Sequence, residues 1–147
     1  MSLVTISGYP CAGKSRRATQ IKDHLEKRLA DPSYSGPPLN VTVISDHTLN
    51  ISRTAYDGRP STVHKPMTQT HEDSRLEKPA RGALFTALQR HLGSDRIVIV
   101  DSLNYIKGFR YQMYCAAREA KVRVCTVRDS APLLPTLLSE RAKSRFM

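Results

Sequence analysis

The stretch GYPCAGKS at residues 8–15 constrains the fold more than any other part of this 147-residue chain. It fits the pattern G-x-x-x-x-G-K-[ST] without a mismatch. The run LVTIS before it is apolar and rich in β-branched residues, which predicts a buried strand, and apolar residues at helical spacing follow it. A strand, a glycine-rich turn and a helix in this order are typical of a phosphate-binding loop in an α/β fold.

Each residue type in this stretch has a chemical reason to be there. Gly8 and Gly13 let the backbone wrap closely around phosphate oxygens, so that successive N–H groups point inward. Lys14 is expected to neutralise the β and γ phosphates, and the Ser15 hydroxyl to ligate Mg²⁺. The predicted nucleotide-binding residues are Gly8, Tyr9, Pro10, Cys11, Ala12, Gly13, Lys14, Ser15 and Arg16.

The rest of the chain alternates between apolar runs and helical periods. Strands are predicted over residues 3–7, 41–45, 96–100 and 122–127. Helices are predicted after Lys14, from near Pro79 and over residues 107–120. The alternation predicts a P-loop α/β fold, with helices on both faces of a parallel sheet, in a single domain over residues 1–147.

Two segments leave the local structure less defined. SRLE at residues 74–77 has the form of a capping box, so a kinked helix that starts before Pro79 is an alternative. Residues 47–72 have no period and predict a flexible loop. The helix from Pro79 is expected to turn one apolar side inward, formed by Ala80, Ala83, Leu84, Ala87, Leu88 and Leu92.

Two aspartates directly follow predicted strands. Asp101 ends the aliphatic run RIVIVD, and Asp46 follows VTVIS. Ligands bind at the carboxyl ends of parallel strands, so both carboxylates are expected near the phosphates. Asp101 is predicted to hold Mg²⁺ directly or through water, and Asp46 to orient an attacking water or accept a proton from a hydroxyl. The predicted catalytic residues are Lys14, Asp46 and Asp101, and the predicted metal ligands are Ser15 and Asp101.

The formal net charge of +10 favours a polyanionic partner, RNA or DNA before a membrane. Residues 105–147 hold nine basic and three acidic residues, which places much of this charge late in the chain. No run of about 18 apolar residues is present, and the first residues lack the pattern of a signal peptide. We therefore expect an intracellular protein. The positive charge has an alternative explanation, since an enzyme that binds only ATP can also be basic.

Several side chains have two interpretations from sequence. Arg75, Arg81 and Arg110 are candidates to reach the γ-phosphate, and none stands out. Cys11 is either a small loop residue or an oxidisable one. Three cysteines and three loop histidines (His47, His64 and His71) show no metal-ligand spacing. The aromatic residues Tyr105, Phe109, Tyr111 and Tyr114 either stack bases or pack in the core.

Two separated blocks carry a family resemblance. GYPCAGKS and the run DSLNYIKGFRY at residues 101–111 resemble the Elongator-associated P-loop ATPases of the killer-toxin-insensitive family, which are related to phosphoseryl-tRNA kinases. EKPARGALFTALQRHL at residues 77–92 is similar to a helix of the same family. The resemblance covers roughly residues 1–128, whereas residues 129–147 depart from the family's pattern.

The resemblance implies an ATPase that is stimulated by tRNA and supports Elongator in modifying wobble uridines, in the cytoplasm and also the nucleus. By position, residues 8–15 would bind ATP·Mg²⁺, with Asp46 and Asp101 serving the metal and the hydrolytic step. The family continues into a C-terminal domain that helps to bind tRNA, so this chain is expected to be an N-terminal fragment that binds tRNA more weakly. An arginine from a lid over the phosphates would lie in the part of the family's domain that this fragment lacks, and Arg141 is a candidate to take its place.

Three functions therefore follow from the sequence. The first is the tRNA-linked ATPase. The second is a phosphotransferase acting on an aminoacyl-tRNA or a nucleoside hydroxyl, which would need the same phosphate-binding parts. The third is a nucleotide-gated module that binds RNA or protein with negligible turnover.

Overall fold

Strand β1 (Ser2–Gly8) runs through the interior of a four-stranded sheet in the computed structural model. The structure describes residues 1–9, 11–52, 55–56, 73–93 and 95–129, with the side chains of residues 73–76 and 129 left aside. The other elements are α1 (Lys14–Leu29), β2 (Asn40–Ser45), α2 (Asp73–His91), β3 (Arg96–Asp101), α3 (Lys107–Glu119) and β4 (Arg123–Asp129).

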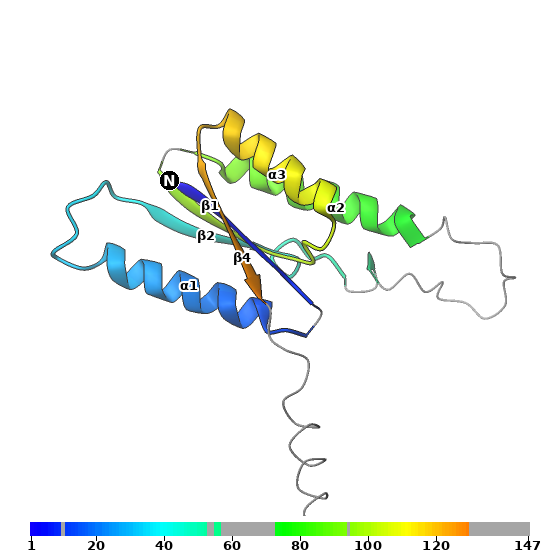
Figure 1. Cartoon of the computed structure of the whole chain (residues 1–147), viewed down its shortest axis with the longest axis horizontal. Helices are drawn as coiled ribbons and strands as arrows, with labels where there is room; N and C mark the ends of the chain where they lie inside the picture. The colour runs from blue at the N-terminus through cyan, green and yellow to red at the C-terminus, as the bar shows by residue number, and fades with distance from the viewer. Residues whose placement is uncertain (10, 53–54, 57–72, 94, 130–147) are drawn as a thin grey trace, which may run out of the picture.

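The sheet has the order β2-β3-β1-β4, and all of its strand pairs are parallel (Figure 1). Helix α1 covers one face, and α2 and α3 cover the other. The predicted three-layer α/β/α fold is confirmed. From β1 the chain crosses to β2 on one side, and from β3 it crosses to β4 on the other. Such a reversal opens a crevice at the carboxyl ends of the strands.

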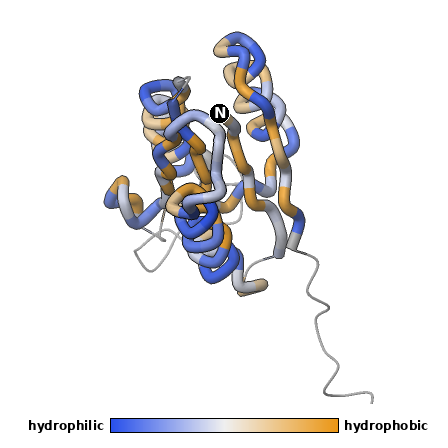
Figure 2. Tube along the Cα trace, turned by 90° about the vertical axis from the view of Figure 1, so that its left-hand side faces the viewer, coloured by the Kyte–Doolittle hydropathy of each residue, from blue (hydrophilic) through white to orange (hydrophobic). Residues whose placement is uncertain are grey.

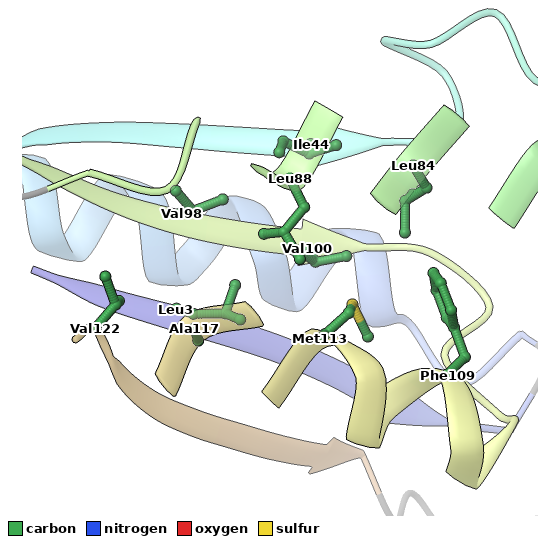
Figure 3. Packing of buried hydrophobic residues seen from close by; sticks show 10 residues of the cluster. All are labelled: Leu3, Ile44, Leu84, Leu88, Val98, Val100, Phe109, Met113, Ala117 and Val122. Atoms are coloured by element: carbon green, nitrogen blue, oxygen red, sulfur yellow. The ribbon is translucent and has the colours of Figure 1, made fainter. Parts of the chain in front are cut away.

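Alternation along the strands divides the core between the two faces. On the face of α2 and α3, Leu3, Val98 and Val100 pack against Leu84 and Met113 (Figure 3). On the opposite face, strand residues that include Val4 and Ile99 pack against Ala18 of α1. Figure 2 shows apolar residues along the strands and hydrophilic ones on the outer turns of the helices. Burial of each large aliphatic side chain contributes about 1.5–3 kcal/mol to the stability of the fold. The packed core therefore keeps the strands, and the residues at their ends, in fixed positions.

Helix α2 differs from the preferred prediction, because it starts at Asp73 and includes Pro79. Proline removes one hydrogen bond and leaves the later turns intact. Those later turns bury Leu84 and Leu88, which stabilises the segment as one helix. Ala83 was expected on the apolar side but is exposed. It lies about 100° around the helix axis from Leu84, outside the buried stripe.

The predicted strand bounds are close to the structure, with each of the first three strands extended by a residue or two. Most of the predicted flexible loop at residues 47–72 lies outside the described residues. Its first part forms turns, in which the Leu49 amide donates to the Ser45 carbonyl at 3.2 Å and the Ile51 amide to the Asp46 carbonyl at 2.9 Å.

The Asn104 side chain joins the carboxyl ends of the two central strands. Its Nδ2 donates to the Ile6 carbonyl of β1 at 2.9 Å and to the Val100 carbonyl of β3 at 3.3 Å. The side chain is 2% exposed, so water cannot replace these bonds. Asn104 therefore fixes the spacing of β1 and β3 at the edge where the crevice lies.

Replacing Asn104 with alanine is expected to lower the free energy of unfolding by roughly 2–4 kcal/mol, because two buried carbonyls lose a donor and a cavity opens. Denaturant titration measures this change. Asn40→Ala is the matched control, since Asn40 is exposed at the start of β2, and it should change stability by less than about 0.5 kcal/mol. Equal effects at the two positions would contradict this role of Asn104.

Candidate functional site

A cavity of about 590 Å³ opens where β1, β2 and β3 end at the same edge of the sheet. Its size is within the range of small-molecule sites. It is lined by Cys11, Gly13, Lys14, Ser15, Arg16, Ser45, Asp46, Ile51, Tyr56, Asp101, Ser102 and Leu103. Residues predicted from three separate parts of the chain thus line a single cavity.

The loop between β1 and α1 has the backbone that its glycines predict. Gly13 has φ 83° and ψ 21°, the left-handed conformation that favours glycine, and it caps the N-terminus of α1. Cys11 also has a positive φ, 59°, which is uncommon outside glycine. Lys14 Nζ donates to the Tyr9 carbonyl at 2.7 Å and lies 3.3 Å from the Gly8 carbonyl. The lysine is therefore held over the loop, beside the cavity that it lines.

The N-terminus of α1 faces this cavity without a side-chain cap. No side chain of the described residues caps the helix start, and no acidic residue lies in its first turn. The first N–H groups of a helix have no partner within the helix and carry partial positive charge. An anion in the cavity would satisfy them, so the geometry suits a phosphate.

Of the other predicted binding residues, Gly8, Tyr9 and Ala12 belong to the loop without lining the cavity, and Pro10 lies outside the described residues.

Asp46 is half-buried at the end of β2 and accepts two side-chain hydrogen bonds. The Ser102 hydroxyl donates to Asp46 Oδ1 at 2.8 Å, and the Tyr56 hydroxyl donates to the same oxygen at 3.0 Å. Burial raises the pKa of Asp46 above its ordinary value of 3.8, the two hydroxyls lower it, and the charge of Asp101 raises it. Sequence reasoning found Asp46 but neither of its partners.

The raised pKa of Asp46 has a consequence for stability. Its ionised form is less favourable in the folded than in the unfolded state, so ionisation costs stability as the pH rises through the folded pKa. Replacement with asparagine removes this cost. The melting temperature of Asp46→Asn, relative to the wild type, is therefore expected to rise as the pH is raised from about 3.8 toward 7, as thermal melts would measure.

Asp31 supplies a control of opposite sign for this measurement. It is fully exposed, and the hydrogen bonds from the side chain and backbone of Ser33 lower its pKa. Asp31→Asn should therefore lose stability relative to the wild type as the pH rises toward about 3.8, and the difference should change little between about 3.8 and 7. A difference between Asp46→Asn and the wild type that is constant with pH would contradict the buried-carboxylate account.

Oxygen donors at the cavity fit a magnesium ion. Ser15 offers a hydroxyl from the first turn of α1, and Asp101 offers a carboxylate from the end of β3. Mg²⁺ prefers oxygen ligands and keeps several waters, so one or two protein ligands beside phosphate oxygens suffice. No cluster of three or more His, Cys, Asp or Glu side chains suited to a metal occurs in the part of the chain that the structure describes.

Two of the candidate arginines, Arg81 and Arg110, have other partners in the structure. The Arg110 guanidinium donates to the carbonyls of Asn104 and Tyr105, at 2.7 and 2.8 Å, and so supports the turn after β3. Arg81 Nε lies 3.6 Å from Glu77 Oε1, which also accepts a hydrogen bond from the Tyr105 hydroxyl. The side chain of Arg75 and all of Arg141 lie outside the described residues.

The aromatic residues after β3 divide between core and surface. Phe109 packs in the core beside Met113, as one of the two sequence interpretations has it. Tyr111 and Tyr114 are 66% and 42% exposed, with stacked rings whose centroids are 6.2 Å apart. Tyr114 lies beside a second cavity of about 610 Å³ on the basic side of α3 and β4, lined by Tyr114, Arg118, Lys121, Val122, Arg123 and Val124.

A family model described as "Chromatin associated protein KTI12" matches residues 1–145, so the expectation that residues 129–147 depart from the family's pattern is wrong for all but the last two residues. This chain belongs to the KTI12 family. It is 36% identical over 132 residues to protein kti12 of Schizosaccharomyces pombe, with 90% of this chain and 42% of that protein covered. It is 35% identical over 133 residues to protein KTI12 of Saccharomyces cerevisiae, with 90% and 37% covered. The chain thus spans about two fifths of the length of these KTI12 relatives.

Solved structures agree with this membership. Kti12 of Chaetomium thermophilum, solved in complex with ADP-AlF3, has a TM-score of 0.69 and 37% identity, with 97% of this chain and 64% of that chain covered. The APS kinase CysC of Mycobacterium tuberculosis has a TM-score of 0.57 at 13% identity, with 98% and 93% covered, which shows a shared P-loop kinase-like fold. No helix in the described residues is long and apolar enough to cross a membrane.

Proposed function

We propose that this chain is the ATP-binding, Mg²⁺-dependent ATPase domain of a KTI12-type protein that acts with tRNA as an accessory factor of Elongator in wobble-uridine modification. The observation that carries the ATPase proposal is the convergence of Lys14, Ser15, Asp46 and Asp101 on one cavity at the N-terminus of α1. The ADP-AlF3 complex of the Chaetomium relative supports it, because that protein is 37% identical over nearly all of this chain.

Each residue has a role in the proposed hydrolysis. The α1 amides and Lys14 would hold the phosphate oxygens and stabilise charge in the transition state. Ser15 and Asp101 would hold Mg²⁺, which supplies further positive charge at the β and γ phosphates. Asp46 would orient a water in line with the γ-phosphorus and accept its proton. The proposed hydrolysis thus depends on residues at the start of α1 and at the ends of β2 and β3.

The alternative phosphotransferase would use the same parts. Asp46 would accept a proton from a nucleoside or aminoacyl-tRNA hydroxyl as readily as from water, since the geometry at the carboxylate is the same for both. ATP labelled at the γ-phosphate, with Mg²⁺ and with or without bulk tRNA, separates the functions. Free labelled phosphate that increases with tRNA supports the ATPase. Label on RNA would identify a kinase, and tight ATP binding without movement of label would identify a nucleotide-gated binding module.

The surface of α3 and β4 supports the proposed tRNA partner. Tyr111 and Tyr114 have stacked, exposed rings, and the exposed residues Arg118, Lys121 and Arg123 line one cavity together with Tyr114. Exposed aromatic rings stack with unpaired bases, while basic side chains neutralise phosphates. We call these five residues the α3–β4 basic surface.

Neutralising the three basic residues of the α3–β4 basic surface to alanine is expected to weaken tRNA binding. The slope of log affinity against log salt concentration should become shallower by about 2, because each contact with a single-stranded phosphate contributes roughly 0.7. Filter binding at several salt concentrations measures it. The triple variant Lys22→Ala, Lys27→Ala and Arg28→Ala is the charge-matched control on α1, across the sheet. An equal loss of slope in both variants would contradict a local RNA site.

The domain organisation and location complete the proposal. Because the chain spans about two fifths of its KTI12 relatives, we propose that residues 1–147 form one nucleotide-binding domain and that a C-terminal region in the longer proteins strengthens tRNA binding. We propose that it acts on tRNA in the cytoplasm and also in the nucleus, and the chromatin association in the family description supports the nuclear location.

A further inference from the structure

We propose that Tyr56 and Ser102 are positioning residues that hold the carboxylate of Asp46 in one orientation toward the attacking group. The inference rests on the proposed phosphoryl chemistry and assigns two residues that the sequence motifs do not contain. Both hydroxyls line the same cavity as Lys14 and Asp101.

The geometry of the three side chains carries the inference. Asp46 follows β2, Ser102 follows β3, and Tyr56 lies ten residues after Asp46, so three separate backbone positions meet at one carboxylate. Ser102 Oγ and the Tyr56 hydroxyl both donate to Oδ1, at 2.8 and 3.0 Å. Two donors on one oxygen fix the plane of the carboxylate. Within the described residues Oδ2 accepts no hydrogen bond, which leaves it for a water or hydroxyl in the cavity.

Both hydroxyls remain hydrogen-bond donors to Asp46 at neutral pH. Burial raises the pKa of Tyr56 to about 12, so its hydroxyl stays protonated and donates at neutral pH. Ser102 is 8% exposed, and the backbone N–H of Asn104 donates to the Ser102 carbonyl at 2.8 Å, which holds the serine in a tight turn. Neither residue lies in the phosphate loop, so each is expected to affect the chemical step and not the affinity for nucleotide.

Tyr56→Phe and Ser102→Ala are each expected to lower kcat by about 10-fold or more, which is the loss typical of one hydrogen bond to a charged group. The KM for ATP and the Kd for ADP should stay within about twofold, since ground-state contacts are unchanged. Ser102→Thr keeps a hydroxyl and should recover most of the lost kcat. A merely structural role would lower nucleotide affinity and would not be rescued in this way.

Two control variants match these changes outside the cavity. The Ser33 hydroxyl donates to Asp31 Oδ1 at 2.7 Å, the same serine–aspartate bond on the surface. The Tyr34 hydroxyl donates to the Pro37 carbonyl at 3.1 Å. Ser33→Ala and Tyr34→Phe should leave kcat unchanged. If they lower it as much as the site variants do, general destabilisation explains the effect and the inference is wrong.

A double-mutant cycle with Asp46→Asn tests whether the two hydroxyls act through Asp46. Asp46→Asn alone should lower single-turnover rates by roughly 10²-fold or more. In that background Tyr56→Phe and Ser102→Ala should add less than about twofold, because the group they position is gone. Full additivity of the losses would overturn the inference.

Binding of ADP with aluminium fluoride supplies a readout that does not depend on turnover. Transition-state analogues bind more tightly than the ground-state ligand when the catalytic groups are aligned. Aluminium fluoride should therefore tighten ADP binding to the wild type, and Tyr56→Phe and Ser102→Ala should lose about 10-fold of this gain while binding ADP alone normally. A wild type that shows neither turnover nor this gain would overturn the proposed function itself. Variants that keep the full gain would overturn only the positioning role.

Discussion

Replacing Lys14 with alanine is expected to lower ATP turnover by about 10³-fold. The lysine ammonium lies over the loop of residues 8–15, where its Nζ bonds to the Tyr9 and Gly8 carbonyls. Phosphoryl transfer spreads negative charge over the γ-phosphate oxygens, and a fixed cation that stabilises this charge contributes about 10²–10³-fold or more to the rate. Steady-state phosphate release, together with nucleotide binding by calorimetry, measures the loss.

Lys22→Ala is the control for this substitution, because Lys22 is on the same helix and pairs with Glu26 at 3.7 Å on the surface. Such an exposed pair contributes little to stability, about 0–1 kcal/mol, and Lys22 does not line the cavity. Its removal should leave turnover unchanged. If Lys14→Ala turned over ATP at the rate of the control, the phosphate loop would have no role in the proposed hydrolysis.

Asp101→Asn is expected to lower kcat on the order of 10²-fold and to raise the Mg²⁺ concentration needed for half-maximal turnover. The exchange replaces a charged oxygen ligand at the end of β3 with a neutral one, which weakens binding of a hard cation. The Mg²⁺ dependence of phosphate release measures both changes. Excess Mg²⁺ should restore part of the activity, which loss of a proton acceptor would not allow.

Asp95→Asn is the matched control, because Asp95 directly precedes β3 and so lies at the opposite end of the sheet. It is exposed, and its carboxylate lies 3.6 Å from Arg96 Nε. The same change of charge there should leave the Mg²⁺ dependence as it is. A parallel shift in both variants would mean that net charge, and not ligation at Asp101, sets the response to Mg²⁺.

The sequence was sufficient for the layers of the fold and for one side of the site. The apolar runs at residues 3–7 and 96–100, directly before the phosphate motif and Asp101, are typical of buried parallel strands, and the structure has the strands there. Asp46 and Asp101 were expected at one edge, and the register pairs Ser45 with Asp101, which brings that edge together. Local pattern was enough because each of these residues ends a strand.

The rest of the site depends on contacts between distant residues. Tyr56 lies in a segment without a period, so nothing local distinguishes it from other loop residues. Ser102 follows a recognised aspartate, and its position next to Asp101 was the one available signal. Arg110 supports the turn after β3 by donating to the carbonyls of Asn104 and Tyr105. Because this turn forms only in the folded chain, the sequence alone did not reveal that role. Helix α2 includes Pro79 because burial of Leu84 and Leu88 outweighs one lost hydrogen bond, a balance that propensity alone does not reveal.

These placements connect the stability of the fold to the proposed chemistry. Asn104 spans β1 and β3, and Arg110 supports the carbonyl of the same Asn104, so the turn after Asp101 is tied to the central strands. Ser102 belongs to that turn and bonds to Asp46. The bonds that hold the sheet edge together thus also orient the carboxylate that we propose to activate water.

The most direct test of the central claim is hydrolysis of ATP in ¹⁸O-labelled water by the wild type and by Lys14→Ala. The account predicts inorganic phosphate that carries ¹⁸O from the wild type, with Mg²⁺ required, and none above background from Lys14→Ala. Absence of labelled phosphate from the wild type, with or without tRNA, would contradict an ATPase in which Asp46 directs water at the γ-phosphate.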